Sequence, residues 1–142
     1  MGDEQNPLTR GAAALVALAA AVVLLAGCSV SVARSSEPGI PDGLSIDQSE
    51  GLGAAAGWIV EGEIFAVVTW GSSSCPRAPV GLEPVGVDQL DLTFDAPSGI
   101  VCTADMAATT HTFDLPAVIT ERPITITVSY RDWDGTDALS LD

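Results

Sequence analysis

The chain has 142 residues, with 19 acidic side chains against five basic ones and a formal net charge of −14. A chain of this length holds one domain. The five basic residues are all Arg, and this acidic balance excludes nucleic-acid partners, because binding to a phosphate backbone needs clustered positive charge.

The first element is an apolar run of 17 residues, 11–27, directly after Arg10. A membrane-spanning helix needs about 20 such residues, whereas a basic residue followed by a shorter apolar core is typical of a signal peptide.

The run ends in the letters LAGC, at residues 25–28, which resemble the lipobox of bacterial lipoproteins. The resemblance implies cleavage before Cys28 and lipidation of its thiol. Two acyl chains would hold the protein stably on the outer, extracytoplasmic face of the cell membrane. The alternative is an uncleaved signal anchor with a free Cys28.

The next segment, 29–50, is rich in Ser, Pro, Gly and Asp, a composition that cannot bury a core. We expect it to act as a flexible tether. The domain assignment is therefore a lipoprotein signal peptide at 1–27, the lipidated Cys28 with the tether at 28–52, and a folded domain at 53–142.

The remaining segments have the pattern of β-strands. A continuous apolar run predicts a strand buried on both faces, and strict alternation predicts strands with one buried face. Turn residues separate the segments, whose ranges are 63–70, 89–94, 110–115, 124–130 and 138–141. The spacing predicts an all-β fold, a small antiparallel β-sandwich of the immunoglobulin-like type. No helix is convincing, because the Ala-rich stretch 51–57 contains too much Gly.

The last hairpin has a register that can be predicted. A two-residue type I′ turn at Asp134-Gly135 would place Tyr130 opposite Leu139 and bring the apolar residues of both strands onto one face.

The other two cysteines, Cys75 and Cys102, form an even pair in an exported chain, which predicts a disulfide between them. The bond would close a loop of roughly 27 residues and contribute about 3.5 kcal/mol in the chain-entropy model. A metal site would need more ligands than these two cysteines and the single His111 supply.

A catalytic alternative rests on the serines of the WGSSSCP segment. Ser73 or Ser74 could act as nucleophile with His111 as base. The carboxylates available as third member are Asp105 and Asp114. Nothing in the spacing selects such a triad, and His111 shares a strand face with Phe113, so we expect it to be packed and hydrogen-bonded.

The DWDGTD segment is the candidate binding surface. Trp70 is expected in the core, whereas Trp133, between Asp132 and Asp134, is expected to be exposed. Packing beside the turn is the favoured role of Trp133, and the alternative is the anchoring of a protein or a sugar, for which exposed Trp side chains are typical. A calcium loop of the EF-hand type would need carboxylates at Tyr130 and Leu141, so no metal is expected, and no cofactor motif is present.

The segments TWGSSSCP, CTADM and TTHTFDLP resemble a domain of small actinobacterial lipoproteins and secreted proteins of unknown function. The resemblance covers roughly 58–141 and implies a compact β domain on the cell envelope, without catalytic residues to carry over.

Together these features predict a monomeric, non-catalytic module that binds or presents an envelope protein or a glycan. The alternatives are a small envelope hydrolase that uses a serine of the GSSSCP loop with His111, and a structural spacer without a specific ligand. The hydrolase requires an exposed His111 beside the serines, and the spacer requires a surface without apolar or aromatic patches.

Overall fold

The computed structural model describes residues 32–46 and 51–142, and every regular element in these ranges is a β-strand. The strands are β1 (Ser35–Pro38), β2 (Ala55–Val60), β3 (Ile64–Gly71), β4 (Ala78–Pro84), β5 (Gln89–Asp95), β6 (Ala107–Asp114), β7 (Ile124–Tyr130) and β8 (Trp133–Leu141). The predicted signal peptide and Cys28 lie outside the described residues. Within the described ranges, no helix is long and apolar enough to cross a membrane.

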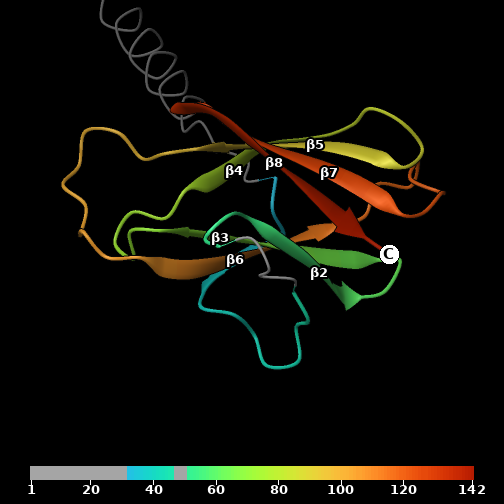
Figure 1. Cartoon of the computed structure of the whole chain (residues 1–142), viewed down its shortest axis with the longest axis horizontal. Helices are drawn as coiled ribbons and strands as arrows, with labels where there is room; N and C mark the ends of the chain where they lie inside the picture. The colour runs from blue at the N-terminus through green and yellow to red at the C-terminus, as the bar shows by residue number, and fades with distance from the viewer. Residues whose placement is uncertain (1–31, 47–50) are drawn as a thin grey trace, which may run out of the picture. The chain divides into compact units, whose positions relative to one another are not determined.

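The strands form two four-stranded sheets, with the orders β1-β6-β3-β2 and β4-β5-β7-β8. In Figure 1 the second sheet is the upper layer, and β2, β3 and β6 lie in the layer below it. This arrangement confirms the predicted all-β sandwich. One feature differs from purely antiparallel pairing, because β5 and β7 are parallel. The chain leaves β5, forms β6 in the other sheet and returns to start β7 at the same end as β5.

The core lies between the two sheets and is built from their inward-facing side chains. Phe65 of β3 stacks on Phe113 of β6, with ring centroids 5.2 Å apart. The predicted alternation is confirmed, because the fully buried residues of β5 and β7 are Leu90, Leu92, Phe94, Ile124, Ile126 and Val128. The continuous run in β3 is also confirmed, since residues 65–69 are all buried. The apolar side chains of facing sheets thus supply most of the hydrophobic stabilisation.

The segment expected to be a tether takes part in the fold. Residues 35–38 form β1, which pairs with β6 through register partners such as Ser36 and His111. Leu44, Ser45 and Ile46 lie against Gly57 of β2, where a Cβ would collide with them. The assignment of all of 28–52 to a tether is therefore wrong for these residues, because they belong to the same compact unit as the residues from 53 onward.

The last hairpin has a different register from the predicted one. Tyr130 pairs with Trp133, and Leu139 lies opposite Ile126, so the two-residue turn is Arg131-Asp132. A type I′ turn needs positive φ at both central residues, and Gly135 is absent from the positive-φ glycines of the described chain. Gly135 is instead required for packing, because the Trp133 indole occupies the space that a Cβ at 135 would fill.

The disulfide between Cys75 and Cys102 is confirmed, with the two Cα atoms 5.5 Å apart. It ties the loop after β3 to the loop before β6.

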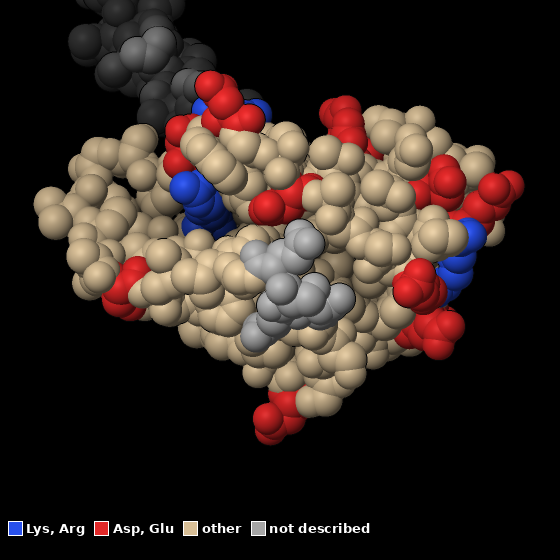
Figure 2. Space-filling view, in the orientation of Figure 1, with Lys and Arg blue, Asp and Glu red and all other residues tan. Residues whose placement is uncertain are grey.

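Arginines and carboxylates are paired on the surface. On the face shown in Figure 2, red acidic side chains are scattered and the blue Arg side chains lie among them. Each Arg in the described ranges forms an ion pair, and these pairs are Arg34–Asp114, Arg77–Asp132, Arg122–Glu61 and Arg131–Asp95. Most of the acidic excess therefore has no cationic partner, and the potential of this surface is negative.

Candidate functional site

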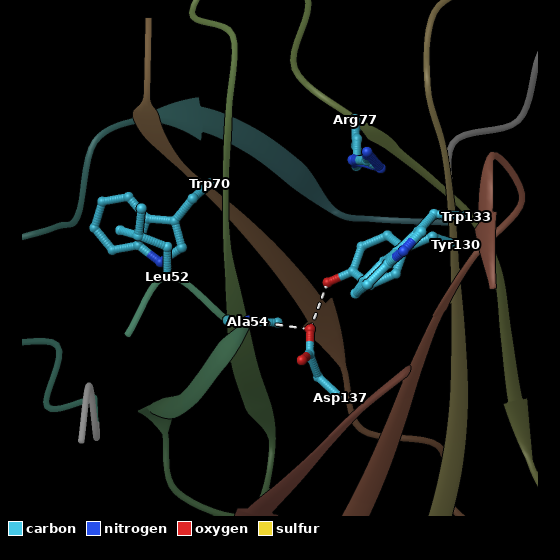
Figure 3. A pocket seen from close by; sticks show the side chains of 8 residues that line it. Leu52, Ala54, Trp70, Arg77, Tyr130, Trp133 and Asp137 are labelled. Atoms are coloured by element: carbon cyan, nitrogen blue, oxygen red, sulfur yellow. Dashed lines mark hydrogen bonds between the residues drawn. The ribbon is translucent and has the colours of Figure 1, made fainter. Parts of the chain in front are cut away.

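An aromatic cleft is the strongest candidate site in the described part of the chain. It encloses a cavity of about 250 Å³. Its walls come from three regions of the chain, at 52–54, 70–77 and 130–137. The lining residues are Leu52, Gly53, Ala54, Trp70, Arg77, Tyr130, Trp133 and Asp137. In the view of Figure 3, Trp70 and Leu52 lie on one side of the cavity and Arg77, Tyr130 and Trp133 on the other.

Trp133 is the first residue of β8. It is the most exposed aromatic side chain of the cleft, with 57% of its surface accessible. Its ring packs beside that of Tyr130, with centroids 5.5 Å apart and planes at 43°. Gly135 leaves room for the indole two residues further along the strand. The predicted exposure of Trp133 is confirmed, and its position is fixed by both neighbours.

Arg77 lies over the ring of Tyr130. Its guanidinium carbon lies 5.0 Å from the Tyr130 ring centroid, the geometry of a cation–π contact. Both terminal nitrogens donate to the Asp132 carboxylate at 2.9 Å, in a bidentate pair. Asp132, which was predicted as part of a binding surface, thus holds Arg77 in place, whereas Asp134 is exposed and does not line the cavity.

Asp137 is hydrogen-bonded to two other residues that line the cleft. Its Oδ2 accepts hydrogen bonds from the Tyr130 hydroxyl at 2.7 Å and from the Ala54 amide at 3.2 Å, both drawn in Figure 3. Burial of the phenol, together with the neighbouring Asp137 carboxylate, raises the pKa of Tyr130 well above its usual value. Tyr130 therefore stays a neutral donor. Oδ1 of Asp137 has no hydrogen-bond donor among the described residues and remains free to accept one.

Trp70 contributes an unsatisfied donor. Its Nε1 atom is buried, and no acceptor among the described residues bonds to it. A buried polar group without a partner costs about 1–3 kcal/mol, so such groups are rare in folded proteins. The prediction that Trp70 belongs to the core is only partly right, because its ring is half-buried and lines the cavity.

The hydrolase site predicted as an alternative is not assembled. The hydroxyls of Ser73 and Ser74 lie 3.4 and 3.1 Å from Thr103 Oγ1, and the Ser73 amide donates to Asp105. Hydrogen bonds from the side chain of Ser73, from Thr103 and from the Ser73 amide lower the pKa of Asp105 to about 2. This cluster ties together the two loops that the disulfide joins.

His111 lies elsewhere, in the core beside β1 and β3. It is 1% exposed, and its ring nitrogens are hydrogen-bonded to Ser36 Oγ at 2.8 Å and Thr69 Oγ1 at 3.2 Å. Its ring also lies 5.0 Å from that of Phe94. Burial lowers the pKa of His111 to about 4. The predicted packed and hydrogen-bonded histidine is confirmed, and the exposed base that the hydrolase requires is not found. Asp114, the other possible third member, pairs with Arg34.

Within the described residues, no group of three or more His, Cys, Asp or Glu side chains could hold a metal ion. Comparisons of the chain with protein-family models, with curated proteins and with solved structures find no match. The cleft is therefore the feature of the molecule from which a function can be inferred.

Proposed function

We propose that this protein is a non-catalytic binding module held on the outer face of the cell membrane by a lipid on Cys28, with the aromatic cleft as its ligand site. The anchor rests on the LAGC motif at the end of the apolar run, a resemblance to bacterial lipoproteins. The partner is an envelope protein or a glycan, and the binding requires no cofactor.

The observation that carries the proposal is the exposed Trp133 at the mouth of a preformed cavity. Ligand sites are concave and largely apolar, with a few polar groups that fix the ligand's orientation. The cleft combines three aromatic rings with one guanidinium and one carboxylate, a lining that is more polar than in most ligand sites. Hydrogen bonds and ring contacts hold Arg77, Tyr130 and Asp137 in place before any ligand arrives, which reduces the entropic cost of binding.

The two alternatives are less well supported. A spacer needs no exposed aromatic patch, yet more than half of the Trp133 surface is accessible. A hydrolase of the predicted type needs His111 beside Ser73 or Ser74, and His111 is bonded to two other hydroxyls.

In-cell crosslinking of the tagged full-length chain tests the binding site. We expect Trp133→Ala to lose most of the captured partner, because truncating a central aromatic residue removes a large share of the binding energy. Val101→Ala is the matched control, since Val101 is 98% exposed and lies outside the cleft. Equal capture by the wild type and by Trp133→Ala would contradict the proposal.

Membrane fractionation tests the anchor separately. We expect Cys28→Ser to lose the lipid mass and to leave the membrane fraction. Retention of Cys28→Ser in the membrane would show that the apolar run acts as an uncleaved anchor.

A further inference from the structure

We propose that the ligand of the aromatic cleft is a neutral glycan, one pyranose ring of which stacks on the Trp133 indole. This inference rests on the proposed function, because it names the ligand class of the same site. Four features of the cleft support it, namely the open aromatic surface, the unsatisfied polar atoms, the charge distribution and the size of the cavity.

The open aromatic surface fits the apolar face of a sugar ring. Trp133 is 57% exposed, and its orientation is set by Gly135 and Tyr130 rather than by a ligand. A pyranose has axial C–H groups on one face and hydroxyls around its edge, so it can cover an indole while its polar groups reach outward. A purely apolar ligand would leave the polar atoms of the cleft without partners.

Those polar atoms comprise one donor and one acceptor. Trp70 Nε1–H has no acceptor among the described residues, and Asp137 Oδ1 has no donor. A sugar hydroxyl both donates and accepts, so the hydroxyls of one ligand can serve either kind of atom. The Trp70 nitrogen is buried, so an acceptor reaches it only if a neighbouring side chain moves. Leu52, which lines the cavity and is 61% exposed, is the side chain that we expect to move.

The charges favour a neutral ligand. An anionic glycan would approach a chain of net charge −14 whose cleft contains Asp137 and whose Arg77 is already paired with Asp132. One cation–π position of the cleft is already occupied, because the Arg77 guanidinium lies 5.0 Å from the Tyr130 ring centroid. A neutral polyhydroxylated ligand is not repelled by the carboxylates and needs no second cation–π position.

The size favours a short stretch of glycan. Pockets for drug-sized ligands measure about 300–1,000 Å³. The cavity of about 250 Å³ is smaller, and it opens to the surface beside Trp133. One or two sugar units would therefore occupy the cleft while the rest of the chain stays outside.

The three indole N–H signals of the protein allow a direct test by ¹⁵N NMR. Trp70 and Trp133 line the cleft, whereas the Trp58 indole lies outside it and donates to the Asp142 carbonyl at 2.9 Å. The full-length ¹⁵N-labelled chain, in a detergent without a sugar headgroup, is titrated with the neutral tetrasaccharides chitotetraose, cellotetraose and maltotetraose. Substitution of each Trp by Phe assigns the signals. We expect at least one sugar to shift the Trp70 and Trp133 signals and to leave Trp58 unchanged.

Variants then test the two contacts separately. We expect Trp133→Ala to weaken binding of that sugar about tenfold or more, the effect typical of a central aromatic residue. Trp70→Phe keeps an aromatic ring but removes the N–H, so we expect about a three- to tenfold loss, the worth of one hydrogen bond. Val101→Ala is again the control and should bind as the wild type does. The Trp58 signal reports whether each variant remains folded.

The outcomes separate this inference from the proposed function. The glycan assignment is overturned if none of the three sugars shifts the cleft signals at millimolar concentration, or if Trp133→Ala binds the sugar as well as the wild type. Titration with tetralysine distinguishes a basic peptide ligand. If tetralysine and not the sugars shifts Trp133, the glycan is wrong but the cleft remains a binding site. If, in addition to the failure of the sugars, the amount of crosslinked partner does not depend on Trp133, the proposed function fails as well.

Discussion

The buried His111 predicts a specific dependence of stability on pH. Burial lowers its pKa from the ordinary 6.5 to about 4, so the imidazole stays neutral in the folded protein over most of the acidic range. In the unfolded chain the same imidazole takes up a proton as the pH falls through 6.5. Because the unfolded state then binds more protons than the folded state, acid favours unfolding. The stabilising contribution is complete above the unfolded pKa and is lost as the pH falls toward the folded one.

The magnitude follows from the two pKa values. Between about pH 7 and about pH 4.5, linkage predicts a loss of about 2–3 kcal/mol in the free energy of unfolding. Asp105 does not obscure this window, because its folded pKa of about 2 lies below its ordinary 3.8, and its contribution is lost at lower pH.

Urea denaturation followed by Trp fluorescence at a series of pH values measures the effect. The matched variant is His111→Gln, which keeps a polar side chain that can bond Ser36 or Thr69 but does not titrate in this range. We expect this variant to be less stable at neutral pH and to lose much less stability on acidification. If the free energy of unfolding fell equally with pH in both proteins, the assignment of the pH dependence to His111 would be refuted.

Three further predictions concern the scaffold, and urea denaturation checks each of them. Joint replacement of Cys75 and Cys102 by Ala should lower the free energy of unfolding by about 3.5 kcal/mol, because it frees a loop of 27 residues, and an unchanged midpoint would contradict this. Gly135→Ala should cost about 1–3 kcal/mol and change the emission of Trp133, since the new methyl group needs the space of the indole. Phe113→Ala should cost about 3–5 kcal/mol, because the ring is fully buried, and a loss below 1 kcal/mol would place it outside the core.

The strands with one buried face could be predicted from the sequence, whereas the edge strands β1 and β4 could not. In β5, apolar residues alternate with polar ones because one face meets the other sheet, and this pattern is visible without a structure. β4 contains Pro79, Gly81 and Pro84, residues that indicate a loop, yet an edge strand tolerates proline. β1 is short and exposed, and its pairing with β6 rather than apolar burial holds it in the sheet. The composition of residues 35–38 therefore predicts a tether, although the structure has a strand there.

The register of the last hairpin could not be predicted from alternation. The predicted partner of Leu139 was Tyr130, and the observed partner is Ile126. This is a shift of four residues, and any even shift keeps inward-facing residues inward. Only the turn distinguishes the two registers, and the Asp-Gly pair indicated the wrong position because Gly135 serves the packing of Trp133.

That error in register explains why only part of the cleft was predicted. A turn at Asp134-Gly135 places Trp133 at the tip of the hairpin, where it would meet solvent alone. The observed turn at Arg131-Asp132 places Trp133 on β8 directly opposite Tyr130. Four residues further along β8, Asp137 lies within reach of the Tyr130 hydroxyl. One shift in pairing thus turns an isolated exposed Trp into one wall of a cavity. The opposite wall consists of Trp70 on β3 and of residues 52–54, just before β2. Both lie far from β8 in the sequence, so no local pattern could have predicted that the two walls meet.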